Sequence, residues 1–465
     1  MTDSLAPGLP AVDDANALQP GVWPRRMARE GDRVSLGSED LADLAQQHGT
    51  PLMVIDEAEV RERARSMRQT LERHLGDVRV YYAGKALLTS DVARWMLEEG
   101  LRVDVCSLGE MMTALRAGVP GADMGLHGNN KSDAELELAV TAGLGSVVLD
   151  SAEEVDRLAA IAARHGAVQP VRLRVAVGVH ASTHDYLATS HEDQKFGVPP
   201  RDVPAIVEGI RSHESLSLLG LHCHIGSQIA SSGGHIESAR RMLELHAALL
   251  AGGEAPELNL GGGFGIRYTA SDDEIDLEQF ATELAQTVRE ECSRLGIPQP
   301  TLCFEPGRSI TGPAGITLYR VGTIKPVQLE GGVRTYVSVD GGMSDNARTA
   351  LYGAQYSARI ISRASDAEPM LTRVVGLHCE SGDIVVDAEW LPADTRRGDL
   401  LAVAATGAYC HSLASNYNAT PRPGIVAVAD GSVRTIVRRE TLDDVLSRDL
   451  GLVTAHEDTT TKGAP

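Results

Sequence analysis

The strongest constraint on the fold is a regular alternation of strand-like and helix-like segments over residues 78–307. Each short apolar run is followed by a segment with apolar residues at helical spacing, such as SDVARWMLEEG (90–100). Strands that alternate with helices in this way form parallel βαβ units. The expected strands are VRVYYAGK (78–85), RVDVCS (102–107), ADMGLHG (122–128), SVVLDS (146–151), VRLRVAV (171–177), LGLHCHIGS (219–227), PELNLGGG (256–263) and TLCFEPG (301–307).

Eight βα units predict a closed (β/α)8 barrel, a TIM barrel, over residues 58–312. The competing arrangement is an open, doubly wound sheet. That fold commonly carries a GxGxxG turn after its first strand. Here the first strand is followed by ALLTSD (86–91), which disfavours the open sheet.

The segments on either side of the barrel predict a second, mainly β domain over residues 313–450. Strand-like runs punctuated by Gly and Pro follow residue 313, and a hairpin is expected around Asp430-Gly431. The N-terminal segment 34–57 holds a helix capped by Ser38 and a strand, Leu52–Ile55, that we expect to join this domain. Residues 1–33 and 451–465 lack periodicity and are expected to be flexible.

Composition narrows the class of protein. The chain has 465 residues and a net charge of −21, which argues against nucleic acid as a partner. No apolar run is long enough to span a membrane, and the N-terminus lacks the apolar core of an export signal. The six cysteines show no CxxC spacing, so we expect free thiols in the cytoplasm.

Chemically active side chains fall where the expected strands end, which is where barrel enzymes carry their active sites. Lys85 would be desolvated there, and desolvation lowers a lysine pKa and frees the amine to bond to a carbonyl. GGGFG (261–265) suits either a phosphate-binding loop or a simple turn. His222 and His224 allow a metal site, but a third ligand at a familiar spacing is missing, so no metal is predicted.

Nine ordered motifs together are much more specific. They are YYAGKA (81–86), HGNNKS (127–132), HEDQKFG (191–197), HIGSQ (224–228), GGGFG (261–265), FEPGRS (304–309), VDGGMSDNARTALYGA (339–354), HCESGD (378–383) and GAYCHS (407–412). From about residue 34 to 450 the chain resembles the diaminopimelate decarboxylases, of the alanine-racemase-like (fold-type III) class of pyridoxal-phosphate enzymes. The resemblance implies decarboxylation of meso-2,6-diaminopimelate to L-lysine and CO2, the last step of lysine biosynthesis, with pyridoxal 5'-phosphate as cofactor.

The resemblance also implies roles for individual residues. Lys85 would carry the cofactor, His224 would stack on its ring, and Glu305 would lie beside the pyridine nitrogen. Cys379 would be the proton donor, supplied with Glu380 by the partner subunit of a homodimer. The implied cofactor contacts are Lys85, Asp104, His224, Ser227, Gly262, Gly263, Glu305, Gly307, Arg308 and Tyr409, and the implied substrate contacts are Arg308, Arg348, Tyr352, Glu380 and Tyr409.

The residue types agree with this chemistry. A carboxylate such as Glu305 stabilises a protonated pyridine, which withdraws charge from Cα; the related racemases use arginine there. A thiol such as Cys379 is a competent general acid. Arg308 and Arg348 suit the far carboxylate of diaminopimelate and Glu380 its far ammonium, whereas ornithine, lysine or arginine would present only a distal cation.

Two departures from the family pattern concern loops. Leu108 stands where a glycine is common, which would make that turn less permissive. Ala347 and Thr349 replace two common prolines beside Arg348, which would loosen that loop. The rival hypotheses are a decarboxylase for another basic amino acid, a non-catalytic regulator of the same fold, and an interaction protein without a ligand. Retention of both Lys85 and Cys379 disfavours the regulator.

Overall fold

The computed structural model describes residues 9–179 and 195–452. These divide into two compact units. The barrel unit comprises Val60–Ile266 and Asp272–Gly312, and the β unit comprises the remaining described residues.

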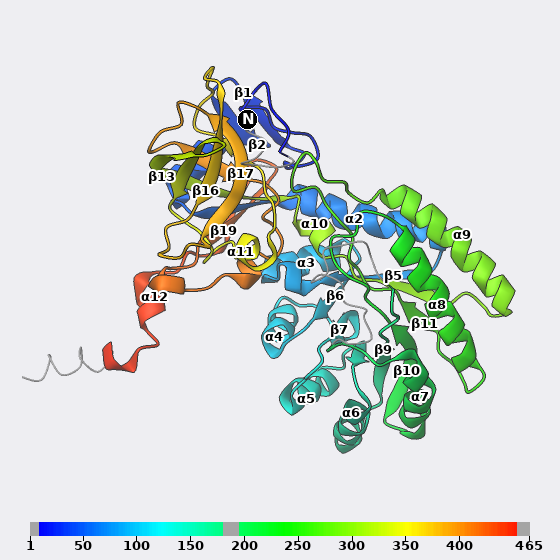
Figure 1. Ribbon diagram of the computed structural model, residues 1–465. Coiled ribbons are helices and arrows are strands. Elements are labelled where there is room, and N and C mark those ends of the chain that lie inside the picture. Colours follow the sequence, from blue (N-terminus) through cyan, green and yellow to red (C-terminus); the bar gives the residue numbers. More distant parts are fainter. Residues whose placement is uncertain (1–8, 180–194, 453–465) are drawn as a thin grey trace, which may run out of the picture. The chain divides into compact units, whose positions relative to one another are not determined.

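The barrel unit is a closed barrel of eight parallel strands, as predicted. Its strands are β5 (Val78–Ala83), β6 (Arg102–Val105), β7 (Met124–Leu126), β8 (Ser146–Leu149), β9 (Gln169–Arg174), β10 (Leu216–His222), β11 (Glu257–Asn259) and β12 (Thr301–Phe304), and β12 pairs with β5 to close it. The helices around it are α2 (Glu57–Leu75), α3 (Ser90–Glu98), α4 (Leu108–Arg116), α5 (Asp133–Thr141), α6 (Ala152–Arg164), α7 (Val203–Ser212), α8 (Gly233–Leu250), α9 (Leu277–Leu295) and the short α10 (Arg308–Thr311) (Figure 1).

A polar layer fills the amino-terminal end of the barrel interior. The buried guanidinium of Arg172 in β9 donates to the Ser146 hydroxyl at 2.6 Å, to the Tyr81 hydroxyl at 2.9 Å and to the Glu257 carboxylate. Barrel interiors are more often filled by branched apolar side chains. The charges and hydrogen-bonding groups of this layer are paired with one another. They fill the amino-terminal end of the barrel, and the chemically active side chains lie at the opposite end.

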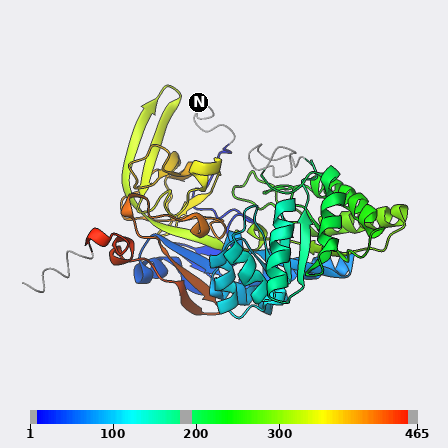
Figure 2. The same ribbon diagram turned by 90° about the horizontal axis from the view of Figure 1, so that it is seen from below.

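The β unit is built on a sheet of order β17-β16-β14-β13-β4-β19-β20, with β15 and β18 attached to it through β13. Figure 2 shows the long β13–β14 hairpin extending from it. The strands are β4 (Leu52–Asp56), β13 (Gly315–Leu329), β14 (Gly332–Val339), β15 (Ala358–Ile360), β16 (Pro369–Val375), β17 (Ile384–Pro392), β18 (Leu400–Val403), β19 (Gly424–Ala429) and β20 (Ser432–Val437), and the helices after residue 313 are α11 (Arg348–Tyr352) and α12 (Leu442–Leu446). The predicted union of β4 with this domain is confirmed, because β4 lies between β13 and β19 and pairs with both. The hairpin expected around Asp430-Gly431 is the β19–β20 pair.

The N-terminal region departs from expectation. It forms β1 (Met27–Glu30), β2 (Arg33–Leu36), β3 (Glu39–Asp40) and α1 (Leu41–His48). The flexible arm expected over 1–33 is wrong for residues 22–33, because Val22 and Trp23 are buried in one apolar cluster with β2 and β4. The helix cap is Asp40 rather than Ser38, since the Asp40 carboxylate accepts the amide hydrogens of Ala42 and Asp43.

Some expectations fall outside the described residues: those for 1–8, for the tail from 453 and for most of the loop near 185–195. Among the described residues, the structure contains no helix with the length and apolarity needed to cross a membrane.

Candidate active site

The carboxyl ends of the barrel strands bring the predicted cofactor residues of the barrel unit to one end. Lys85 lies in a one-turn 3-10 helix, Gly84–Ala86, that follows β5, and Asp104 lies in β6. His224 follows β10, the glycines 261–263 follow β11, and Glu305 follows β12. A strand prediction running to Ser227 is too long, because β10 ends at His222.

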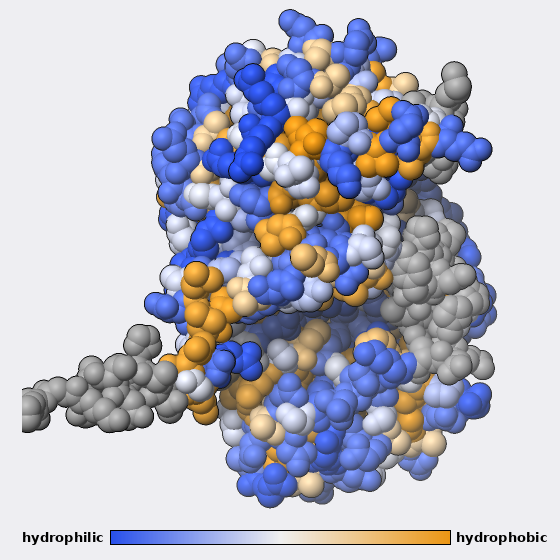
Figure 3. Space-filling model, turned by 60° about the vertical axis from the view of Figure 1, so that its left-hand side comes forward, coloured by the Kyte–Doolittle hydropathy of each residue, from blue (hydrophilic) through white to orange (hydrophobic). Residues whose placement is uncertain are grey.

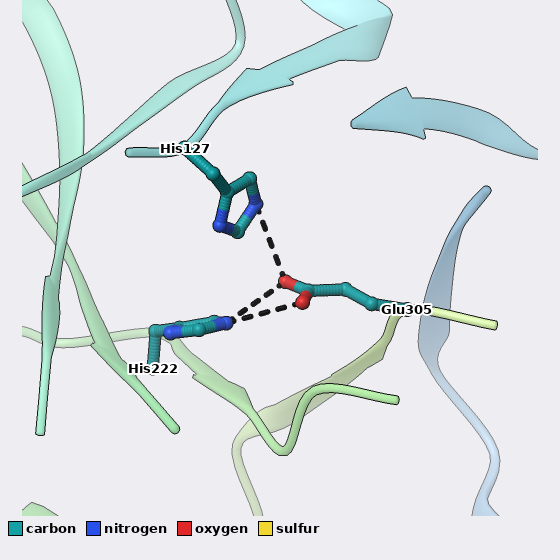
Figure 4. A group of neighbouring side chains, drawn as sticks. All are labelled: His127, His222 and Glu305. Atoms are coloured by element: carbon teal, nitrogen blue, oxygen red, sulfur yellow. Dashed lines mark hydrogen bonds and ion pairs between the residues drawn. The ribbon is translucent and has the colours of Figure 1, made fainter. Parts of the chain in front are cut away.

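Glu305 is the centre of a buried hydrogen-bonded group (Figure 4). The Nε2 of His222 lies 3.1 Å from each of its carboxylate oxygens, and Asn259 donates from Nδ2 to Oε1 at 2.7 Å. The Nε2 of His127 approaches Oε1 to 3.4 Å. Because a carboxylate only accepts hydrogen bonds, His222 carries its proton on Nε2. Glu305 is thereby fixed in one orientation at the end of β12.

The charges in this group follow from burial and hydrogen bonding. Burial lowers the pKa of His127 and that of His222 to about 4, so both imidazoles are neutral at neutral pH. Burial raises the pKa of Glu305, but the imidazoles of His222 and His127 lower it by more, to well below its ordinary value. The group therefore holds one carboxylate charge between neutral N–H donors.

Asp104 approaches the same nitrogen of His127, with its Oδ1 3.2 Å from Nε2. That approach lacks hydrogen-bond geometry, and neither carboxylate oxygen of Asp104 accepts a hydrogen bond from the described residues. Burial, and then the charge of Glu305, raise the pKa of Asp104 well above its ordinary value. Both effects favour the protonated form of its carboxyl group. Gly125 leaves it room, since a Cβ there would lie 2.5 Å from Oδ1.

Three glycines shape the loop after β11. A Cβ on Gly261 would lie 2.4 Å from the carbonyl oxygen of Cys223, one on Gly262 2.0 Å from that of Glu305, and one on Gly263 2.5 Å from that of Gly226. Gly261 and Gly263 also have positive φ of 70° and 102°. Side chains are therefore excluded at these three positions, because the loop packs closely against the segments that follow β10 and β12.

Arg308 and Ser227 lie together beside the same end of the barrel. The buried Arg308 donates from Nη2 to the Ser227 hydroxyl at 2.8 Å. Gly307 precedes it, and a Cβ there would lie 3.0 Å from Ala83 Cβ, at the end of β5. A buried cation beside a hydroxyl offers donors suited to phosphate.

His224 is neutral, because burial and then the charge of Lys85 lower its pKa well below the ordinary value. Its Nδ1 accepts the Gly262 amide hydrogen at 3.3 Å, which fixes its ring against the glycine loop. The Lys85 side chain is exposed, so the expected desolvation of its amine is wrong for the chain described here. Its charge nevertheless acts on His224 and Asp104, so the amine lies near these strand-end residues.

The predicted substrate residues Arg348, Tyr352 and Tyr409 belong to the β unit. Arg348 is buried at the start of α11 and donates to the hydroxyls of Tyr268 at 2.8 Å and Tyr356 at 2.5 Å. Its guanidinium lies 5.9 Å from the ring centroid of Tyr409, which has a strained φ of 65°. Tyr352 is exposed at the other end of α11.

Cys379 and Glu380 lie in the loop between β16 and β17, and both are exposed. The Glu380 carboxylate accepts the Gly382 amide hydrogen at 3.4 Å, and Cys379 is a free thiol. Both groups are thus presented at the surface of the β unit.

The two departures from the family pattern have local explanations. Leu108 is the first residue of α4 and is capped by Ser107, so this position is helical and needs no glycine. Beside Arg348, the Thr349 hydroxyl donates to the carbonyl of Val385 in β17 at 3.0 Å, an anchor that proline would lack.

Sequence reasoning missed the partners of Glu305. In the sequence, His127 stands at the end of an expected strand with no role assigned to it, and His222 and His224 are considered together as metal ligands. The structure instead groups His127, His222 and Glu305, with ligand atoms within 4.8 Å of one another. Two histidines and a carboxylate suit zinc, but Glu305 already accepts hydrogen bonds from His222 and Asn259. Arg174, buried at the end of β9, was also missed; it stacks on Phe196 at 4.4 Å.

Residues 57–312 match the family described as pyridoxal-dependent decarboxylase, pyridoxal binding domain. The match covers the barrel and its strand-end residues. The fold and the family together define the class of pyridoxal-dependent decarboxylases.

Similarity over the full chain narrows the class. The chain is 50% identical over 444 residues to diaminopimelate decarboxylase of Mycobacterium tuberculosis (strain ATCC 25618 / H37Rv), covering 93% of this chain and 98% of the relative. It is 47% identical over 458 residues to that of Corynebacterium efficiens, covering 97% and 99%. The crystal structure of diaminopimelate decarboxylase from M. jannaschii in co-complex with L-lysine superposes with a TM-score of 0.85, at 28% identity and 92% and 98% coverage. The chain belongs to the diaminopimelate decarboxylase family.

The strand-end residues fit pyridoxal phosphate. The loop 261–263 has no room for side chains, and the Arg308–Ser227 pair offers donors for a phosphate. Glu305 is a buried carboxylate of fixed orientation, as a protonated ring nitrogen requires. Lys85 supplies an amine at the same end of the barrel.

Proposed function

We propose that this protein decarboxylates meso-2,6-diaminopimelate to L-lysine and CO2, the last step of lysine biosynthesis, with pyridoxal 5'-phosphate as its cofactor. The observation that carries the proposal is the match to diaminopimelate decarboxylases, which extends over 98% of the length of the M. tuberculosis enzyme. The buried Glu305 and its neutral donors supply the matching chemistry in the barrel.

When bound, pyridoxal phosphate supplies an electron sink for the charge left on Cα as CO2 departs. Lys85 would hold the cofactor covalently through Nζ, and Glu305 would keep a proton on the ring nitrogen. His224 would cover one face of the ring. Ser227, Gly262, Gly263, Gly307 and Arg308 would bind the phosphate, while Asp104 and Tyr409 would complete the cofactor contacts.

The proton that replaces CO2 at Cα would come from the Sγ of Cys379. Arg348 would hold the far carboxylate of the substrate, since a guanidinium pairs with a carboxylate bidentately. Its bonds to Tyr268 and Tyr356 preorganise it for this task. Glu380 would pair with the far ammonium, and Arg308, Tyr352 and Tyr409 complete the proposed substrate contacts.

We further propose a homodimer in which each subunit lends Cys379 and Glu380 to the active site of the other. Both residues are exposed, as expected for side chains that enter the active site of a second subunit. Exposed apolar side chains accompany them on the same unit, namely Leu351, Tyr352, Leu377, Leu413 and Tyr417. Apolar side chains that face solvent contribute stability when a partner covers them. Figure 3 shows apolar side chains among hydrophilic ones on one face of the molecule.

A cytoplasmic location fits the thiols. All six cysteines lie within the described residues and are free. Free thiols persist in a reducing compartment, and we propose that the enzyme works there.

A substrate panel tests the function. Purified protein with added pyridoxal phosphate should release CO2 from meso-diaminopimelate and form lysine, with little release from lysine, ornithine or arginine. A cofactor absorbance band should be present in the wild type and absent from Lys85→Ala, while Lys325→Ala, an exposed lysine of β13, keeps it. Turnover of ornithine without turnover of diaminopimelate would refute the substrate, and a wild type without the band would favour a regulator.

A further inference from the structure

Asp383 joins two loops of the β unit that carry proposed active-site residues. It immediately precedes β17 and is almost completely buried, with 3% of its surface exposed. Its Oδ1 accepts the Met343 amide hydrogen at 2.6 Å, and its Oδ2 accepts the His378 amide hydrogen at 2.7 Å. Met343 lies in the loop that leads to Arg348, and His378 directly precedes Cys379. Each carboxylate oxygen of Asp383 therefore accepts a hydrogen bond from a different loop.

Glycines on both loops make room for this carboxylate. A Cβ on Gly342 would lie 2.5 Å from Asp383 Oδ1, and a Cβ on Gly376 would lie 2.2 Å from Oδ2. Neither glycine has positive φ, so backbone conformation does not require them. Their missing side chains are explained by the close approach of Asp383 to both backbones.

His378 extends the connection to a third loop. Its Nε2 lies 2.8 Å from the Ser344 hydroxyl, and its Nδ1 lies 3.1 Å from Oδ1 of Asn418. The Ser415 amide also donates to the carbonyl of Ser344 at 2.8 Å. The loops around 344, 378 and 415–418 thus form one hydrogen-bonded assembly, and Asp383 is its buried, charged member.

We propose that Asp383 is a positioning residue for the reaction. It fixes the loop of Arg348, which would bind the far carboxylate in its own subunit's site, and the loop of Cys379 and Glu380, which would enter the partner's site. The inference rests on the proposed function for the roles of those three residues. Asp383 is not among the proposed substrate or cofactor contacts. Its two charge-assisted hydrogen bonds would fix the backbone of both loops before substrate binds.

The test compares Asp383→Asn with Asp387→Asn. Asp383→Asn replaces one carboxylate oxygen with an NH2 group. This group faces a backbone N–H and cannot accept its hydrogen, so one of the two loops loses its hydrogen bond. Asp387 lies in β17, the strand that follows Asp383, is partly exposed and pairs with Arg373 at 2.6 Å, so it controls for the charge change. We expect kcat/KM for diaminopimelate to fall about 10- to 100-fold in Asp383→Asn, with kcat lower and KM higher. In Asp387→Asn it should stay within about twofold of wild type.

Two readouts separate positioning from general damage. Amide hydrogen exchange should accelerate in 341–346 and 376–382 of Asp383→Asn while the barrel keeps its protection and its bound cofactor per subunit. A lower kcat with unchanged KM and unchanged exchange would overturn the inference, because it signals only fewer active molecules. Rapid exchange of the Met343 and His378 amides in the wild type would also overturn the inference, and this measurement needs no variant. If the wild type fails to decarboxylate diaminopimelate, the proposed function falls, and the exchange measurement still decides whether Asp383 holds the loops.

Discussion

The Nε2 of His222 lies 3.1 Å from both carboxylate oxygens of Glu305, and this imidazole is neutral because burial lowers its pKa to about 4. A neutral donor keeps the carboxylate in place without cancelling its charge. Glu305 can therefore present a full negative charge to a cofactor nitrogen.

Removing that charge should impair catalysis more than cofactor binding. Glu305→Gln keeps the shape of the side chain and should lower kcat about 100-fold or more, since it removes electrostatic stabilisation where charge develops. The cofactor absorbance band should persist, because Lys85 is intact. Glu290→Gln, on the exposed face of α9, is the matched control. A near-normal kcat in Glu305→Gln would contradict this assignment.

The buried histidine makes stability depend on pH with a definite sign. The pKa of His222 is about 4 in the folded chain against an ordinary 6.5, so the unfolded chain binds more protons between those values. Stability contributed by keeping His222 neutral is therefore present above pH 6.5 and lost as the pH falls towards 4. His222→Gln lacks this loss, so its deficit in the free energy of unfolding relative to wild type should be smaller at pH 5 than at pH 7.5, by about 2 kcal/mol, and its melting temperature should move closer to that of wild type. A constant deficit would show that His222 is not neutral and buried.

Mixing inactive subunits tests the shared sites. Lys85→Ala and Cys379→Ala should each be inactive as homodimers. If each subunit lends its Cys379 to the other, refolding an equal mixture yields mixed dimers with one intact site and about a quarter of wild-type activity. A mixture as inactive as its components would place both residues in the same subunit's site.

Arg348 should govern substrate affinity. Arg348→Lys keeps the charge but loses the planar fork that bonds to Tyr268 and Tyr356. We expect KM for diaminopimelate to rise about tenfold or more, with a smaller change in kcat. Arg320→Lys, an exposed arginine of β13, should leave both constants unchanged. Steady-state kinetics of the two variants decide the point.

Leu108 should matter for helix stability rather than for the reaction. Because it is the first residue of α4, Leu108→Gly should destabilise the fold by about 0.5–1 kcal/mol without changing kcat. Ser107→Ala removes the cap of the same helix and should destabilise by about 1 kcal/mol. Urea unfolding measures both, and a more stable Leu108→Gly would contradict the helical assignment.

Features that depend on repeated local patterns were predictable from sequence. The barrel strands recur with helices between them, and the residues that end them, such as Lys85 and Glu305, follow from that alternation. The β19–β20 hairpin was readable from Asp430-Gly431, where both residues have positive φ.

Features set by contacts between distant residues were not predictable. Glu305 meets His222 across 83 positions of sequence, and nothing local marks that pairing. Val22 and Trp23 lie in an aperiodic stretch, so their burial against β2 and β4 leaves no pattern. Lys85 is exposed in the 3-10 turn Gly84–Ala86, and strand periodicity predicts neither the turn nor the exposure.

The position of β4 between β13 and β19 imposes an order on biosynthesis. The ribosome delivers β4 before the barrel, but its two neighbours emerge only after residues 315 and 424. Every residue of β4 is buried in the finished protein, so the nascent chain must carry an apolar strand with both edges unpaired throughout barrel synthesis. A chain that stops short of β19 keeps one of those edges open. Premature termination should therefore yield a barrel attached to an aggregation-prone N-terminal segment, and chaperones would have to bind that segment to keep the chain from aggregating.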